Sequence, residues 1–179
     1  MSTPRKTILL TGGRAPVTLD LARMFHGAGH RVLVAESLPQ HLCRHSRFVA
    51  RSFDVPAPNR DFDGFIGALA RIARDERVDL LVPTCEEIFH VSRGRDTLSA
   101  HCEVLAAPWN QLRRLHSKWD FIQALSARGV RVPETWLLES QADADALLAR
   151  LPAGTRLVFK PVFSRFATQI AFPVAGQSA

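Results

Sequence analysis

The sequence predicts an α/β protein whose first part is built on a doubly wound, parallel β-sheet. Short apolar runs alternate with longer stretches of helical periodicity from the N-terminus to about residue 108. The apolar runs are not interrupted by polar residues. Strands of that kind are covered on both faces, which requires parallel strands joined by right-handed helical crossovers.

The first half of this region contains three predicted strands and one helix. Residues 7–11 (TILLT) form a strand that leads through a glycine turn into a helix, and Gly27 and Gly29 end that helix. Residues 31–35 (RVLVA) form the second strand, which ends at Glu36. Residues 48–55 form a short third strand.

The second half continues the alternation. Residues 62–73 repeat apolar side chains at helical spacing, and residues 79–82 (DLLV) form an apolar strand that ends before Pro83. A helix over residues 86–98 and a strand over residues 103–106 complete the series. Residues 1–108 are therefore expected to form one Rossmann-like domain.

After Pro108 the pattern changes, and residues 109–179 are expected to begin a second domain without completing it. Asn110 is placed to cap a helix that runs to Gly129, with a break near residues 116–117. The later predicted elements are a strand at 135–138, a helix at 142–151, a strand at 156–161 and a partner strand at 169–174.

Composition excludes several classes of protein. With 46% hydrophobic and 22% charged residues the chain is typical of globular proteins. No apolar run reaches the roughly 18 residues that cross a bilayer, and the N-terminus leads into a strand instead of an export signal, so we expect no membrane partner. Three cysteines without a CxxC pair (Cys43, Cys85 and Cys102) favour a reduced compartment, so a cytoplasmic protein is expected.

The net charge of +6 does not predict nucleic-acid binding. The basic residues are 20 arginines and 3 lysines, scattered among acidic residues and without the aromatic spacing of a base-stacking surface. Charge also disfavours a metal site at His41, Cys43 and His45, because the nearby arginines would repel a cation. We expect neither nucleic acid nor a metal at these positions.

The loop after the first strand is one candidate site. It lies at the carboxyl end of a strand and the start of a helix, where doubly wound proteins bind ligands. Its sequence, Thr11-Gly12-Gly13-Arg14-Ala15-Pro16, lacks the glycines of a dinucleotide-binding loop. Glu36 stands where NAD enzymes place a ribose-binding acid. A tight turn with a solvated Glu36 is the favoured interpretation over a dinucleotide site.

A second candidate is Thr84-Cys85-Glu86-Glu87, which follows the strand at 79–82. Because both loops follow strand ends, we expect Gly12–Gly13 and Thr84–Glu87 to lie close together. The two carboxylates could bind a substrate amine or hydroxyl, or they could be the favourable first-turn acids of the next helix. Residue type alone leaves these two interpretations equal.

The lysines form the third candidate. Lys118 begins the segment KWDF, and Lys160 ends an apolar strand in a chain that otherwise uses arginine. A lysine at the end of a buried strand is a common ligand of nucleotide phosphates. Ser164, Arg165 and Thr168 follow in a loop that could cover those phosphates. The alternative is a surface hairpin with a chance lysine.

Together these segments resemble the ATP-grasp superfamily, in particular its carboxylate–amine ligases and the members like the large chain of carbamoyl-phosphate synthase. The resemblance is carried by ILLTGGRAPVTLDLARMF, DLLVPTCEEIF, LHSKWDFIQALSARGVRVPETW and LVFKPVFSRFATQ, which occur in the family's order and cover most of the chain. It implies a pre-ATP-grasp domain over residues 1–108 and the start of an ATP-grasp domain over residues 109–179.

The resemblance also implies roles for individual residues. Lys118 and Lys160 match nucleotide-contacting lysines, and Ser164, Arg165 and Thr168 fall in the loop that covers the phosphates. Gly12, Gly13 and Glu86 match positions that face the carboxylate or amine substrate. These assignments are expectations that the resemblance supplies.

The implied cofactors of a complete protein are ATP and Mg²⁺, and the implied partners are small-molecule carboxylate and amine substrates. The expected reaction is activation of the carboxylate as an acyl phosphate, followed by attack of an amine or similar nucleophile. The family's magnesium ligands and adenine-binding hinge match no residue here. We therefore expect a truncated portion that is inactive as an isolated chain, and we assign no catalytic residue.

Two other functions stay open at this stage. One is a Rossmann-type dinucleotide-binding enzyme, which the Arg14–Pro16 loop disfavours. The other is a non-enzymatic interaction or regulatory module that kept the fold. A further expectation concerns residues 157–174, whose apolar strand lacks its covering lobe. This segment is predicted either to be mobile or to pair with a second copy in a homodimer.

Overall fold

The computed structural model describes residues 4–164 and 169–176. The chain divides into two compact units, Met1–Leu112 and Arg113–Ala179. Within the described ranges, no helix is both long enough and apolar enough to cross a membrane.

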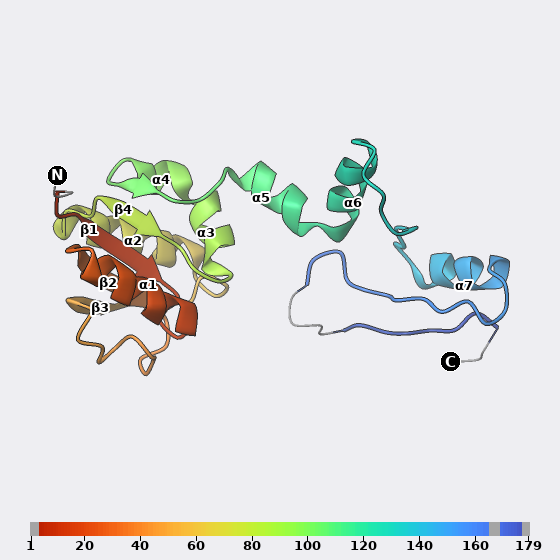
Figure 1. Ribbon diagram of the computed structural model, residues 1–179, viewed down its shortest axis with the longest axis horizontal. Helices are drawn as coiled ribbons and strands as arrows, with labels where there is room; N and C mark the ends of the chain where they lie inside the picture. The colour runs from red at the N-terminus through yellow and green to blue at the C-terminus, as the bar shows by residue number, and fades with distance from the viewer. Residues whose placement is uncertain (1–3, 165–168, 177–179) are drawn as a thin grey trace. The chain divides into compact units, whose positions relative to one another are not determined.

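The first unit is built on a five-stranded parallel sheet (Figure 1). The central pair is in register from Thr7 opposite Arg31 to Thr11 opposite Ala35. The strand order β3-β2-β1-β4-β5 confirms the predicted doubly wound α/β class. The strands are β1 (Thr7–Thr11), β2 (Arg31–Glu36), β3 (Arg51–Asp54), β4 (Leu80–Val82) and β5 (Glu103–Val104).

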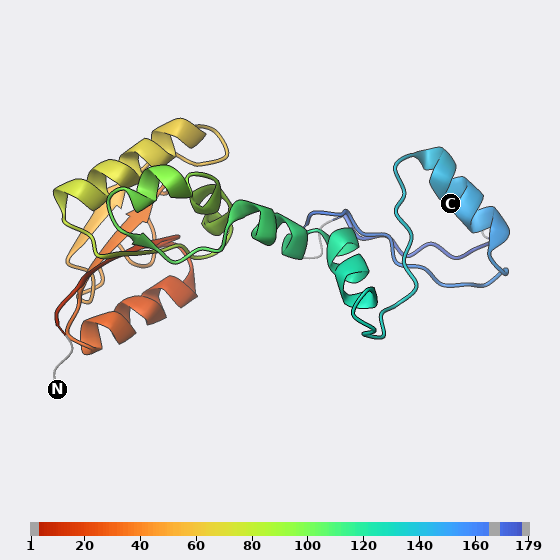
Figure 2. The same ribbon diagram turned by 90° about the horizontal axis from the view of Figure 1, so that it is seen from above.

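Helices cover both faces of this sheet, which explains its uninterrupted apolar strands. Ile8 and Leu10 of β1 face a core that includes Ala22 of α1 (Pro16–Gly27). Leu9, between them in the sequence, faces the opposite core with Leu69 of α2 (Phe62–Asp75). Figure 2 shows α1 and α2 on opposite sides of the sheet. Successive side chains of β1 therefore pack into two separate hydrophobic cores, one on each face of the sheet.

The helix predicted over residues 86–98 is interrupted. It forms two short helices, α3 (Glu87–Arg93) and α4 (Arg95–Ser99), on either side of Gly94. A Cβ atom at Gly94 would lie 2.5 Å from Cδ1 of Ile66 on α2. The interruption therefore lets the backbone approach α2 more closely than any residue with a side chain would allow.

A serine separates the next two helices, as the sequence predicted. α5 (Trp109–His116) and α6 (Lys118–Ser126) meet at Ser117, whose hydroxyl accepts a hydrogen bond from the backbone N–H of Asp120 at 3.1 Å. That bond caps α6. The predicted cap at Asn110 is wrong, because α5 begins at Trp109 and contains Asn110.

The rest of the second unit contains one helix and an antiparallel pair of extended segments. α7 (Gln141–Arg150) lies one residue from the predicted bounds and has a capping box built by Ser140 and Asp143. The strands predicted at 156–161 and 169–174 pair only through isolated bridges, Arg156–Val174 and Phe159–Ala171. The strand predicted at 135–138 is wrong, since these residues have no described partner strand to pair with.

Candidate functional site

The loops after β1 and β4 meet at the carboxyl end of the sheet, and their predicted proximity is confirmed. The hydroxyl of Thr84 donates to the carbonyl oxygen of Thr11 at 2.8 Å. The Thr18 and Thr84 hydroxyls are also 2.8 Å apart, and the Thr18 hydroxyl bonds to the carbonyl oxygen of Gly12 at 2.7 Å. These buried hydroxyls hold the start of α1 against the loop after β4.

The two glycines of the first loop allow close packing within the chain. Gly12 has φ +68°, and a Cβ atom there would lie 2.4 Å from Oγ1 of Thr84. A Cβ atom at Gly13 would lie 2.6 Å from Nδ1 of His41. Both glycines are buried. The absence of a side chain at Gly12 and Gly13 thus lets Thr84 and His41 pack against the loop. These two side chains occupy the space in which a ligand would approach the glycine backbone.

Arg14 joins two carboxylates, one at the end of β2 and one at the start of α3. We refer to Arg14, Glu36 and Glu87 as the Arg14 cluster. Nη1 of Arg14 lies 3.1 Å from Oε2 of Glu36 and 2.5 Å from Oε1 of Glu87. The Glu36 side chain is fully buried and that of Glu87 is 7% exposed, whereas one third of the Arg14 side chain reaches solvent. β2, β1 and β4 are neighbours in the sheet, so their carboxyl ends bring these residues together.

The expectation of a solvated Glu36 is wrong. This residue is only 2% exposed, because Arg14 and the following loop close over its carboxylate. The backbone N–H groups of Arg14, Ser37 and Leu38 donate to it at 3.0, 2.7 and 3.2 Å. Both oxygens are therefore in use, which disfavours the dinucleotide-binding alternative, where this acid would have to accept ribose hydroxyls.

The environment shifts the pKa values of Glu36 and Arg14 toward their charged forms. Burial by itself raises the pKa of Glu36, but the backbone hydrogen bonds from Arg14 and Leu38 and the charge of Arg14 outweigh it. The net pKa of Glu36 lies below its ordinary value of 4.5. The pKa of Arg14 is raised, mainly by its hydrogen bond to Glu87.

Of the two adjacent acids after β4, Glu87 is the one in the Arg14 cluster. Glu86, the predicted substrate-facing acid, is half-buried at the N-cap position of α3 and makes no described bond to Arg14. Oε2 of Glu87 is buried and has no hydrogen-bond partner among the described residues. The sequence alone favoured Glu86 and did not indicate a role for Arg14. The missed signal was that Glu36 ends β2, while Arg14 and Glu87 lie in or just after the loops that follow β1 and β4, the next two strands along the sheet.

The second unit brings together two of the predicted nucleotide-binding residues. Nζ of Lys118 donates to the carbonyl oxygen of Ser164 at 3.2 Å and to its hydroxyl at 3.0 Å. The backbone N–H of Lys118 also donates to the carbonyl oxygen of Val162 at 3.1 Å. The first residue of α6 is therefore fixed to the segment that follows Lys160.

Lys160 itself is exposed, and no described residue forms a hydrogen bond or ion pair with its side chain. Arg165 and Thr168, the other predicted phosphate contacts, lie outside the described residues. Among the described residues, no group of three or more His, Cys, Asp or Glu side chains is arranged to hold a metal ion.

Among known proteins, solved structures share the fold of this chain, but their sequence identity to it is low. No protein-family model and no curated protein sequence matches the chain. Solved structures match it with low identity. N5-carboxyaminoimidazole synthetase from Staphylococcus aureus, complexed with ADP, is 16% identical with a TM-score of 0.71, over 96% of this chain and 42% of that one.

Two further structures agree. L-amino acid ligase from Bacillus licheniformis is 16% identical with a TM-score of 0.71, over 90% of this chain and 39% of that one. The biotin carboxylase domain of Hydrogenobacter thermophilus 2-oxoglutarate carboxylase, solved as a dimer with MgADP, ADP and bicarbonate, is 12% identical with a TM-score of 0.72, over 95% and 38%. The chain thus has the fold of the N-terminal part of ATP-grasp ligases and spans about two fifths of their length.

Proposed function

We propose that this chain is the N-terminal portion of an ATP-dependent ligase of the ATP-grasp type. In the complete protein, a carboxylate would be activated as an acyl phosphate and then attacked by an amine or similar nucleophile. The observation that most supports this proposal is the contact of Lys118 with Ser164, four residues after Lys160, within a chain that has the ATP-grasp N-terminal fold.

The two lysines suit the binding of nucleotide phosphates. An ammonium group is a compact point charge with three donors, and it stabilises the charge that develops on a transferring phosphoryl group. The Lys118 ammonium is already oriented by two oxygen acceptors of Ser164. Lys160 is exposed and free of described partners, so its charge is available to an anion. ATP, when bound, would supply the phosphoryl group.

Magnesium is not assigned to any residue of this chain. The described residues offer no cluster of acidic or histidine side chains that fits a metal ion, so we derive no step through it. The role that we propose here is limited to positioning the nucleotide and the substrate.

We propose that the non-nucleotide substrate binds at the carboxyl end of the sheet in the first unit. Glu86 remains a proposed contact there, whereas the proposed role of Gly12 and Gly13 is to shape this end of the sheet through their packing against Thr84 and His41. Glu87 adds a buried carboxylate whose Oε2 can accept a hydrogen bond from a substrate N–H or O–H group. Arg14 Nη1 holds the other oxygen of that carboxylate at 2.5 Å and so fixes its orientation.

Calorimetric titration of the chain with ADP and ATP, with and without Mg²⁺, tests the nucleotide site. Lys118→Ala and Lys160→Ala should each weaken binding by about tenfold to a hundredfold, since each removes a charge-assisted hydrogen bond. The matched control is Lys6→Ala, which removes the third lysine, in the first unit, and should leave binding unchanged. Nucleotide binding that Lys118→Ala and Lys160→Ala leave as strong as the Lys6→Ala control would refute the proposed role of the two lysines.

A turnover assay tests whether the chain is inactive by itself. We expect no Mg²⁺-dependent ATP hydrolysis above background from this chain alone with any small carboxylate. Turnover that Lys160→Ala abolishes would contradict this expectation and would show a complete catalytic set. A chain that binds no nucleotide at all would favour the interaction or regulatory module instead.

A further inference from the structure

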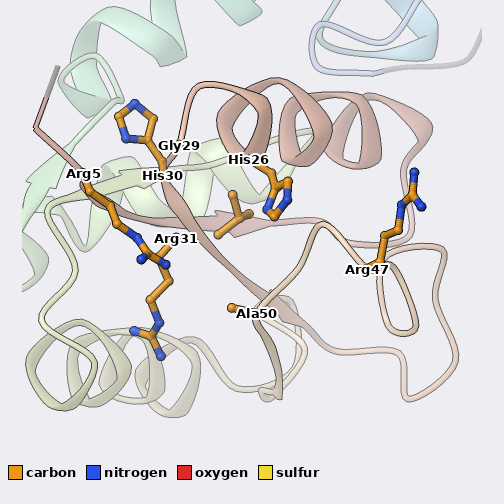
Figure 3. A pocket seen from close by; sticks show the side chains of 8 residues that line it. Arg5, His26, Gly29, His30, Arg31, Arg47 and Ala50 are labelled. Atoms are coloured by element: carbon orange, nitrogen blue, oxygen red, sulfur yellow. The ribbon is translucent and has the colours of Figure 1, made fainter. Parts of the chain in front are cut away.

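A basic pocket lies at the opposite end of the sheet from the Arg14 cluster. It has a volume of about 180 Å³ and is lined by three arginines and two histidines: Arg5, Arg31, Arg47, His26 and His30. No acidic side chain lines it. Figure 3 shows Arg5 and Arg31 on one side and Arg47 on the other, with Ala50 between them.

The chain elements place these residues at the amino ends of the central strands. Arg31 is the first residue of β2, and Arg5 comes just before β1. His26 is in the last turn of α1, and Arg47 is in the loop before β3. Because β1 and β2 each span five or six residues at roughly 3.3 Å per residue, about 15 Å separates this pocket from the carboxyl end of the sheet.

The positive charge in the pocket is only partly neutralised. Nη2 of Arg31 lies 2.5 Å from Oε2 of Glu76, but Arg51 binds the other oxygen of the same carboxylate at 2.7 Å. Two guanidinium groups thus share one negative charge. Within the described part of the chain, neither Arg5 nor Arg47 forms an ion pair, and the Arg47 guanidinium lies over the ring of Phe48 at 5.0 Å.

The adjacent helix end does not cancel this charge. The last carbonyl groups of α1 would repel an anion if they faced the pocket unpaired. They are instead bonded by the turn that follows: Gly29 N–H donates to the carbonyl of His26 at 2.9 Å, and His30 N–H donates to that of Phe25 at 3.0 Å. Gly29 has φ +88°, the left-handed conformation that this helix ending needs.

The His30 ring is fixed by the same part of the chain. Its Nδ1 atom accepts a hydrogen bond from the backbone N–H of Lys6 at 3.2 Å, which also fixes the residue that follows Arg5. The backbone groups at this end of α1 are therefore hydrogen-bonded within the chain. The positive charges of the arginines outnumber the carboxylates that contact them.

We propose that this basic pocket binds a small phosphate-bearing ligand through Arg5, Arg31 and Arg47. Guanidinium groups bind phosphate oxygens through paired N–H donors, and several such groups around one hollow fit a multiply charged anion better than a single carboxylate. The volume is below the roughly 300–1,000 Å³ of a pocket for a drug-sized molecule, so a phosphate group fits and the remainder of a larger ligand would extend into solvent.

Such a ligand would bind outside the proposed substrate site. It would lie about 15 Å from the carboxyl end of the sheet, where the proposed substrate contacts are. This inference does not rest on the proposed nucleotide site, because every residue that it uses belongs to the first unit.

The test is a titration of the ¹⁵N-labelled full chain with inorganic phosphate and with pyrophosphate, at constant ionic strength set by chloride. We expect saturable shifts in the amide signals of residues 26–32 and 47–50. The double variant Arg5→Ala/Arg47→Ala should weaken binding at least about tenfold, since two charged donors are lost. The control Arg60→Ala removes an equally exposed arginine outside the pocket and should change the affinity less than twofold.

Three results would overturn the proposal: no saturable shift in these amides, an equal loss in the Arg60→Ala control, or binding that survives the double variant. Both arginines are exposed, and a well-dispersed spectrum confirms that the double variant is folded. The variant Lys118→Ala/Lys160→Ala separates the two proposals. It should abolish nucleotide binding and leave phosphate binding at residues 26–32 unchanged, whereas a parallel loss would assign the phosphate to the lysines.

Discussion

Replacing Arg14 with methionine keeps most of the hydrocarbon stem of this side chain and removes the charge between Glu36 and Glu87. The change leaves two carboxylates, exposed by 0% and 7%, without their shared cation. Glu36 keeps hydrogen bonds from three backbone N–H groups. Arg14 is the only partner described for the Glu87 carboxylate, so Glu87 should bear most of the cost.

The size of the effect follows from burial. Removing one partner of a fully buried ion pair typically costs about 3–5 kcal/mol. The Arg14 side chain is 34% exposed, so water screens part of its interaction and can replace part of it. We therefore expect Arg14→Met to lower the free energy of unfolding by about 2–3 kcal/mol at pH 7.

The effect should depend on pH with a definite sign. The folded-state pKa of Glu36 is below 4.5, so its stabilisation is present above pH 4.5 and is lost as the pH falls through the folded-state pKa. In the variant the Glu36 carboxyl group binds a proton more readily, because the charge of Arg14 that lowers its pKa is gone. The difference between variant and parent should therefore be largest near neutral pH and should shrink in acid.

Urea denaturation measures this difference. Trp119→Phe and Trp136→Phe in the parent leave Trp109 as the fluorescent reporter of the first unit. The control Arg23→Ala removes an exposed ion pair with Asp20 and should change stability by less than about 0.5 kcal/mol. A change of that same small size for Arg14→Met at pH 7, or a loss that grows in acid, would refute this reasoning.

Three further predictions use the same unit and its neighbour. Gly12→Ala should lower the free energy of unfolding by about 2–4 kcal/mol, because this position combines a positive φ with a contact at 2.4 Å. Gly29→Ala, at φ +88° with open space around it, should lower it by about 1 kcal/mol. Equal losses of stability in urea would contradict the packing argument. The pKa of His90 lies below its ordinary 6.5, because of burial and the nearby charge of Arg93, so stability should fall as the pH drops below 6.5. His90→Phe should flatten that fall between pH 7.5 and 5, and parallel profiles would be the contrary result. Hydrogen exchange with light scattering should find residues 157–164 and 169–174 either weakly protected or protected in a dimer, and strong protection in a monomer would exclude both.

Much of the fold could be predicted from the sequence because the signals were local. Uninterrupted apolar runs such as TILLT and RVLVA are sufficient for buried parallel strands, and Ser117 marks a helix start through its own side chain. The predicted strand at 135–138 failed for a different reason. A strand exists only if a partner is present to pair with it, and the sequence of the segment does not show that partner.

The candidate site was less predictable because it depends on which strands are neighbours. Glu36 looked solvated, since a lone acid at a strand end usually is. It is buried because Arg14, 22 residues earlier, lies in the loop that follows the adjacent strand. Glu86 and Glu87 are chemically identical in the sequence. Only the position at the start of α3 decides that Glu87 contacts Arg14.

The contact between Lys118 and Ser164 implies an internal competitor for the proposed nucleotide. Two oxygens of Ser164 occupy the ammonium group that phosphate oxygens would need, so nucleotide binding becomes an exchange of one acceptor for another. The measured affinity for the nucleotide is then lower than that of a free Lys118, because only the molecules in which Lys118 has left Ser164 can bind it. Ser164→Ala, which removes the hydroxyl and keeps the carbonyl, should therefore strengthen nucleotide binding.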